Sequence, residues 1–67
     1  SMLKESDILF ELGVYWVCKG NKSGYEVYRT GITHSTRVAI IGYEGAKGLE
    51  RAKAECERRI KEDKTKG

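Results

Sequence analysis

The sequence predicts an α+β fold, in which a three- or four-stranded antiparallel β-meander is followed by one C-terminal α-helix packed on the sheet. Two observations predict this fold. Between residues 42 and 63, apolar side chains recur every three or four positions, which is the spacing of one face of a helix. Before that stretch, short apolar and aromatic segments are separated by glycine-containing turns, as in strands joined by hairpins.

The first strands are short. Residues 7–12 form an apolar segment that we interpret as an edge strand, with a helical turn as the alternative because Asp7 could cap it. Residues 14–19 and 25–29 are rich in aromatic and β-branched side chains, which favour strands. The segment 20–24 between them holds two glycines and an asparagine, which are typical of turns.

The next strand, residues 36–42, is unusual because Val38 to Ile41 would present apolar side chains on both faces of the sheet. One face must contact the helix, which leaves apolar surface on the other. This pattern favours either a central strand or a sheet face covered by a second chain. The sequence leaves both interpretations open, and a homodimer or another partner chain is the second of them.

The helix is expected to begin near Gly45 or Ala46, or at Gly48, since glycine in a first turn costs about 1 kcal/mol relative to alanine. It is expected to end near Glu62, with residues 1–6 and 63–67 frayed. A shift of one residue in strand register would exchange the two faces of a strand. The predicted core consists of Val14, Trp16, Val27, Val38, Ile40, Leu49, Cys56 and Ile60.

The length of 67 residues predicts a single small domain spanning residues 1–67. A domain of this size is marginally stable and often relies on a disulfide, a metal or a partner chain. Cys18 and Cys56 lack metal-ligand spacing, and we interpret them as buried free thiols, with a Cys18–Cys56 disulfide as the alternative. We therefore expect a protein partner or self-association, with no metal and no cofactor.

The sequence contains neither a signal-peptide pattern nor an apolar run long enough for a membrane span, so a cytoplasmic location is expected. The net charge of +3 is unevenly distributed. Residues 1–44 carry five basic and five acidic side chains, whereas residues 45–67 carry eight basic and five acidic ones. The predicted sheet is therefore charge-neutral, unlike the strongly basic surface of a dedicated nucleic-acid binder.

No catalytic set is predicted. His34, the single histidine, lies beside Thr33 and Ser35 in a segment expected to be a hairpin loop. A nucleophile and base need a cleft, an orienting group and an oxyanion site, which a tight loop on a small domain does not offer. We therefore interpret His34 as a loop residue and expect no enzymatic activity and no small-molecule substrate.

Aromatic and cationic side chains form the predicted binding surface. If the helix covers the sheet face with Tyr25 and Val27, the opposite face shows Glu26 and Tyr28 and could add neighbours from adjacent strands. Such a set suits protein interfaces, and it could also stack nucleic-acid bases. The predicted partner-binding residues are Tyr15, Tyr28, Arg29 and Arg37. A second candidate stripe on the outer helix face consists of Lys47, Arg51, Arg58 and Lys61.

Three stretches carry a family resemblance, namely residues 25–29, 33–39 and 48–56. Over residues 14–60 the chain resembles small uncharacterised proteins encoded by phages and prophages. This group offers no functional residues to carry over. The resemblance implies a mobile-element accessory protein in a bacterial cytoplasm, and such proteins often bind a host complex, including defence systems, or bind DNA.

The order of sheet and then helix is also similar to the three-stranded DNA-binding domains of some phage integrases, which need a basic exposed sheet. The sequence therefore predicts a small non-catalytic binding protein of phage or mobile-element origin that acts through protein–protein contact. The alternative is a nucleic-acid-binding module that uses the tyrosines and arginines of the sheet.

Overall fold

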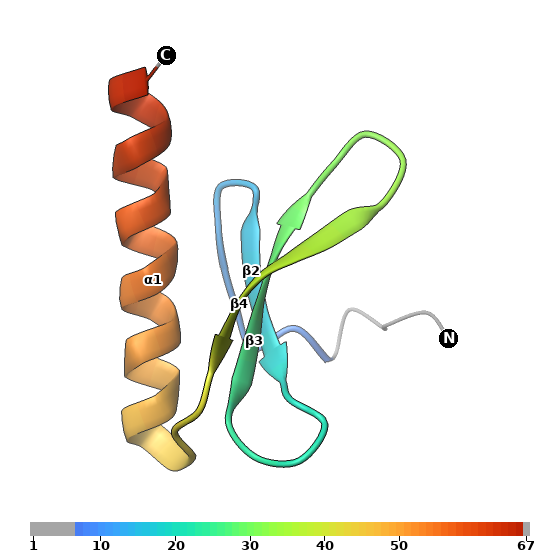
Figure 1. Ribbon diagram of the computed structural model, residues 1–67, viewed down its shortest axis with the longest axis vertical. Coiled ribbons are helices and arrows are strands. Elements are labelled where there is room, and N and C mark those ends of the chain that lie inside the picture. The colour runs from blue at the N-terminus through green and yellow to red at the C-terminus, as the bar shows by residue number, and fades with distance from the viewer. Residues whose placement is uncertain (1–6, 67) are drawn as a thin grey trace.

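The computed structural model describes residues 7–66, in which a four-stranded antiparallel sheet is followed by one long helix packed against it (Figure 1). The predicted α+β fold is thereby confirmed. The elements in chain order are β1 (Phe10–Leu12), β2 (Tyr15–Lys19), β3 (Tyr25–Thr30), β4 (Ser35–Ile41) and α1 (Gly45–Lys66).

The strands pair in sequence order, β1-β2-β3-β4, so that β1 and β4 form the two edges of the sheet within residues 7–66. Short hairpins allow this order. Gly13, with φ of 60°, closes the β1–β2 turn, and Gly24, with φ of 83°, precedes β3. Residues with a Cβ rarely adopt such positive φ values, which is why glycine occupies both corners. In Figure 1 the β3–β4 hairpin curls away from the helix.

The helix is longer than the sequence predicted. Residues 63–66, expected to be a frayed tail, continue α1 to Lys66. The physical reason is a tertiary hydrogen bond, because the hydroxyl of Tyr15 donates to the carboxylate of Asp63 at 2.6 Å and holds this last part of the helix against β2. The prediction that residues 1–6 are frayed concerns a segment outside the described residues.

The core lies between the helix and one face of the sheet. It consists of Tyr15, Val17, Tyr25, Val27, Ala52 and Cys56. Leu49, Val38 and Ile60 pack against this cluster, as expected. Burial of Val17 and Val27, which are fully buried, contributes about 1.5–3 kcal/mol each.

Two residues were wrongly predicted to lie in the core. In β2, the side chains that face the helix are those one position away from the predicted ones. Val14 precedes the strand and is 39% exposed, and Ile40 is 64% exposed. Trp16 is buried, but its register with Tyr28 places it on the face opposite the core. Tyrosine can replace tryptophan in this core because its hydroxyl reaches a polar partner at the core boundary.

The start of α1 depends on a close approach between backbone and ring. Gly48 is buried, and a Cβ at this position would collide with the backbone oxygen of Tyr43 and approach the ring of Tyr25 to 2.7 Å. The Tyr25 hydroxyl in turn donates to the Gly45 carbonyl at 2.9 Å. The helix therefore begins at Gly45 rather than at Gly48. Glycine at position 48 lowers the intrinsic stability of the helix, but only glycine leaves room for the Tyr25 ring and the Tyr43 backbone to pack this closely.

Candidate functional site

The strand register divides the sheet side chains into two faces. Tyr15, Val17 and Val27 face the helix, and the pairs Trp16–Tyr28 and Cys18–Glu26 therefore lie on the opposite face. Within residues 7–66, no helix packs on that second face, since α1 lies on the other side (Figure 1). We call the face that carries Trp16, Cys18, Glu26, Tyr28, Arg37 and Ile40 the open face.

A β-bulge in β4 decides which of its side chains reach the open face. The β3–β4 register shifts between the pairs Val27–Ala39 and Tyr28–Arg37, which leaves Val38 as the extra residue of β4. Val38 and Ala39 both pack against the core. Arg37 and Ile40 consequently share the open face. Because of the bulge, most apolar side chains of β4 pack on the helix-covered face, although the apolar segment is continuous in sequence.

An aromatic pair forms the centre of the open face. The rings of Trp16 and Tyr28 stack with centroids 4.6 Å apart and an interplanar angle of 11°. The Tyr28 hydroxyl donates to Glu26 at 2.9 Å, and the guanidinium of Arg37 contacts the second oxygen of the same carboxylate at 3.3 Å. Four side chains from three strands are thus held in one arrangement before any partner arrives.

The electrostatics of this face are balanced. Glu26 pairs with Arg37, so the arginine is not a free cation. Donation to Glu26, with a further effect of burial, raises the pKa of Tyr28 and so favours the protonated phenol that donates this bond. Cys18 is also buried on this face, and burial raises the pKa of its thiol, which keeps it in the poorly nucleophilic protonated form.

Of the predicted partner-binding residues, the structure brings Tyr28 and Arg37 together, as paired neighbours on β3 and β4. Tyr15 is only 3% exposed, on the helix-covered face, so its prediction as a surface residue is wrong. Arg29 pairs with Tyr15 across the β2–β3 ladder, and its guanidinium lies 6.0 Å from the centroid of the Tyr15 ring. The physical reason is the register of β2, which points Tyr15 and Arg29 to the side opposite Tyr28.

The second candidate stripe is exposed along α1, as expected, but its members differ in their contacts. Arg58 donates to both Glu55 and Glu62, at 2.6 Å and 2.7 Å. Arg51 lies over the ring of Tyr43, 4.0 Å from its centroid. The remaining members, Lys47 and Lys61, are exposed and form no ion pair with another residue of the described chain.

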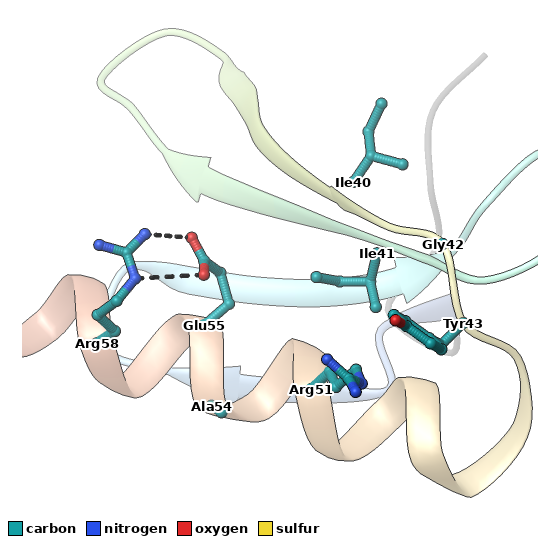
Figure 2. A pocket seen from close by; sticks show the side chains of 8 residues that line it. All are labelled: Ile40, Ile41, Gly42, Tyr43, Arg51, Ala54, Glu55 and Arg58. Carbon is teal, nitrogen blue, oxygen red and sulfur yellow. Dashed lines mark hydrogen bonds and ion pairs between the residues drawn. The ribbon is translucent and has the colours of Figure 1, made fainter.

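A groove that the sequence did not indicate runs between the end of β4 and α1. It has a volume of about 350 Å³. Figure 2 shows Ile41 pointing toward the helix, Tyr43 beside Arg51, and Glu55 bonded to Arg58 along one wall. Ile40, Ile41, Gly42, Tyr43, Arg51, Ala54, Glu55 and Arg58 line it. Arg51 and Arg58 belong to the second candidate stripe, so the sequence analysis had singled out two of the lining residues but had placed them on the outer helix face.

His34 lies exposed in the β3–β4 hairpin, with its Nδ1 3.0 Å from the hydroxyl oxygen of Thr33. Among residues 7–66 no three His, Cys, Asp or Glu side chains gather as metal ligands would. Cys18 and Cys56 are both free, and they lie on opposite sides of the sheet.

Comparison with protein-family models, with curated proteins and with solved structures found no match for this chain. None of the helical segments in the described part of the chain is long and apolar enough to cross a membrane.

Proposed function

We propose that this protein is a small non-catalytic binding module that contacts another protein through the open face of its sheet. The observation that carries the proposal is the Trp16–Tyr28 stack with the Glu26–Arg37 ion pair beside it. Trp16 is only 9% exposed and supports Tyr28 by stacking, so Tyr28 and Arg37 are the side chains that can reach a partner. Tyrosine and arginine are enriched at protein interfaces. Because their mutual contacts already fix these side chains, less conformational entropy is lost on binding.

A nucleic-acid-binding module is the second candidate, and the same geometry disfavours it. Glu26 would face the phosphates at the centre of the open face, and its contact with Arg37 neutralises the nearest cation. The other predicted nucleic-acid contacts, Tyr15 and Arg29, lie on the helix side. This candidate predicts affinity for DNA or RNA that falls steeply with salt. Titration with generic duplex and single-stranded DNA and RNA, at low and physiological salt, tests it directly.

The absence of catalysis is part of the proposal, and two observations support it. His34 lies exposed in a hairpin loop. Burial raises the pKa of both the Cys18 and the Cys56 thiols, which disfavours the reactive thiolate. The resemblance to small phage and prophage proteins supplies a setting, namely a mobile-element protein in a bacterial cytoplasm, whose partner is a host protein complex such as a defence system.

A matched pair of double variants tests the proposed surface. Tyr28→Ala with Arg37→Ala removes the centre and rim of the open face, whereas Lys47→Ala with Lys61→Ala removes cations from the outer helix. In an affinity capture from bacterial lysate followed by quantitative mass spectrometry, we expect a protein retained by the wild type and the helix variant to be lost with the face variant. Retention by a folded face variant would overturn the proposal.

A further inference from the structure

Among the described residues 7–66, β4 is an edge strand, and its outer backbone lies beside an exposed apolar side chain. A Cβ on Gly24 would collide with the carbonyl oxygen of Ile41, so this carbonyl is directed toward β3. Backbone groups in an antiparallel ladder alternate in direction, and the N–H and C=O of Ile40 therefore point away from β3. The Ile40 side chain is 64% exposed at the same place. This edge can accept another strand.

The bulge limits where such a strand could pair. The guanidinium of Arg59 donates to the Val38 carbonyl at 2.9 Å, which satisfies the backbone at the bulge from within the chain. A paired strand would therefore be interrupted at Val38, and the stretch that follows the bulge in β4 has Ile40 at its centre. A short open edge next to a blocked one selects a particular register rather than indiscriminate pairing.

The helix beside this edge carries a charge pattern that is complementary to itself. Arg51, Glu55, Arg58 and Glu62 follow one another at spacings of four, three and four residues along one side of α1. Read in the opposite direction, the order becomes Glu, Arg, Glu, Arg. An antiparallel second copy would therefore place Arg51 opposite Glu62, and Glu55 opposite Arg58, about an axis between Glu55 and Arg58.

The centres of these two patterns lie at the same level of the molecule. Tyr43 lies beside Arg51, and Val38 contacts Arg59, so that β4 and α1 run antiparallel along the groove. Between these contacts, Ile40 lines the same groove as Glu55 and Arg58 (Figure 2). One two-fold axis can thus pass through Ile40 and between Glu55 and Arg58.

We propose that two copies of this chain form a symmetric dimer by pairing their β4 edges in antiparallel fashion, with Ile40 opposite Ile40 of the second copy. Directly opposed residues must share a sheet face, and centring on Ile40 meets this condition, since it also places Ala39 opposite Ile41 on the helix side. The two helices flank the shared groove with complementary charges. This interface does not rest on the proposed function, and it leaves Tyr28 accessible on both copies.

Two single charge reversals test the helix part of the interface. In an Arg51→Glu dimer, the new glutamate of each copy faces Glu62 of the other, and in a Glu62→Arg dimer the new arginine faces Arg51. Like charges then oppose each other, so each variant alone should dimerise about tenfold more weakly than the wild type, as measured by analytical ultracentrifugation. An equimolar mixture restores both complementary pairs and should form a heterodimer of near wild-type affinity. A mixture no tighter than its components would overturn the proposal, as would a monomeric wild type at millimolar concentration.

A cross-link tests the register. Ile40→Cys places two thiols opposite each other, where paired Cα atoms lie about 5.5 Å apart, within disulfide reach. Cys18 lies two strands away, about 10 Å, and cannot bridge to it. Mild oxidation should yield a disulfide-linked dimer of Ile40→Cys. The control Ile32→Cys, at a fully exposed position in the hairpin, should yield much less of this dimer. Equal cross-linking of both variants would contradict the β4 interface.

Discussion

The phenol of Tyr15 in β2 donates a 2.6 Å hydrogen bond to the carboxylate of Asp63 near the end of α1. This contact joins the sheet to a part of the helix that lies beyond its apolar stripe. It fixes how far α1 extends along the sheet and allows a tyrosine to occupy the core. The open face depends on this choice, because burying Tyr15 directs Trp16 to the other side.

We expect Tyr15→Phe to lower the free energy of unfolding by about 1 kcal/mol, since the ring remains and only the hydrogen bond is lost. Urea denaturation at pH 7 measures this change. Asp63→Asn is the matched variant, because its amide oxygen can still accept from Tyr15, and it should cost less. An unchanged midpoint for Tyr15→Phe would show that the contact contributes nothing to stability.

The same contact predicts a difference at alkaline pH. Donation to Asp63, followed by burial, raises the pKa of Tyr15 above its ordinary value of 10.0. A group whose pKa is raised by folding stabilises the protein fully below its unfolded pKa, and this stabilisation is lost as the pH rises through the folded pKa. Between neutral pH and pH values above 10, the wild type should therefore lose more stability than Tyr15→Phe. Parallel pH profiles of the two proteins would contradict this.

Gly48→Ala should destabilise the protein by about 1–3 kcal/mol, although alanine favours an isolated helix by about 1 kcal/mol. The added methyl group would collide with the Tyr43 backbone oxygen and the Tyr25 ring. Gly42→Ala is the control, because its Cβ would meet no atom within 4 Å. Thermal unfolding of both variants by circular dichroism measures the difference. Equal melting temperatures would show that the helix start relaxes freely.

The stacked pair on the open face should have a measurable coupling energy. A double-mutant cycle of Trp16→Leu and Tyr28→Leu is expected to give about 0.5–1.5 kcal/mol of interaction, as found for aromatic pairs in contact. Chemical denaturation of the four proteins supplies the cycle. Additive single effects would mean that the two rings are not pre-arranged, which would weaken the case for an interface that loses little entropy on binding.

Acid should selectively weaken the helix network around Glu55. Hydrogen bonding from Arg58, and then from Arg59, lowers the pKa of Glu55 below its ordinary 4.5 despite partial burial. Its stabilisation is therefore complete above pH 4.5 and is lost as the pH falls through the folded pKa. Between pH 6 and pH 3, Glu55→Gln should lose less stability than the wild type in urea denaturation. Glu57→Gln, which removes an exposed carboxylate, should behave like the wild type.

The sequence alone was sufficient for the fold class, because periods of two and of three to four residues were clear on either side of residue 42. It was insufficient for the faces of β2, since Tyr15 and Trp16 are both large and apolar enough for a core. The structure places Tyr15 and Val17 under the helix, where the Tyr15 hydroxyl donates to Asp63.

The candidate site was predicted in part for a related reason. Tyr28 and Arg37 were correctly assigned to one face, but the bulge at Val38 that brings Arg37 there leaves no sequence signal. The end of the helix was also predicted wrongly. Asp63 has the composition of a solvated tail, and its hydrogen-bond partner Tyr15 lies 48 residues earlier in the sequence. Likewise, the charge order of Arg51, Glu55, Arg58 and Glu62 is visible in the sequence, but its importance depends on the neighbouring open edge.

The most direct test of the open face as a protein-binding surface is site-specific photo-cross-linking in bacterial cells. A benzoylphenylalanine replaces Glu11, the exposed neighbour of Trp16 across the β1–β2 ladder, in one variant, and Glu57 on the outer helix in the other. We expect a discrete covalent adduct with another protein from position 11 and none from position 57. Adducts of equal yield at both positions, or adducts with nucleic acid alone, would contradict the proposal that this face binds a protein.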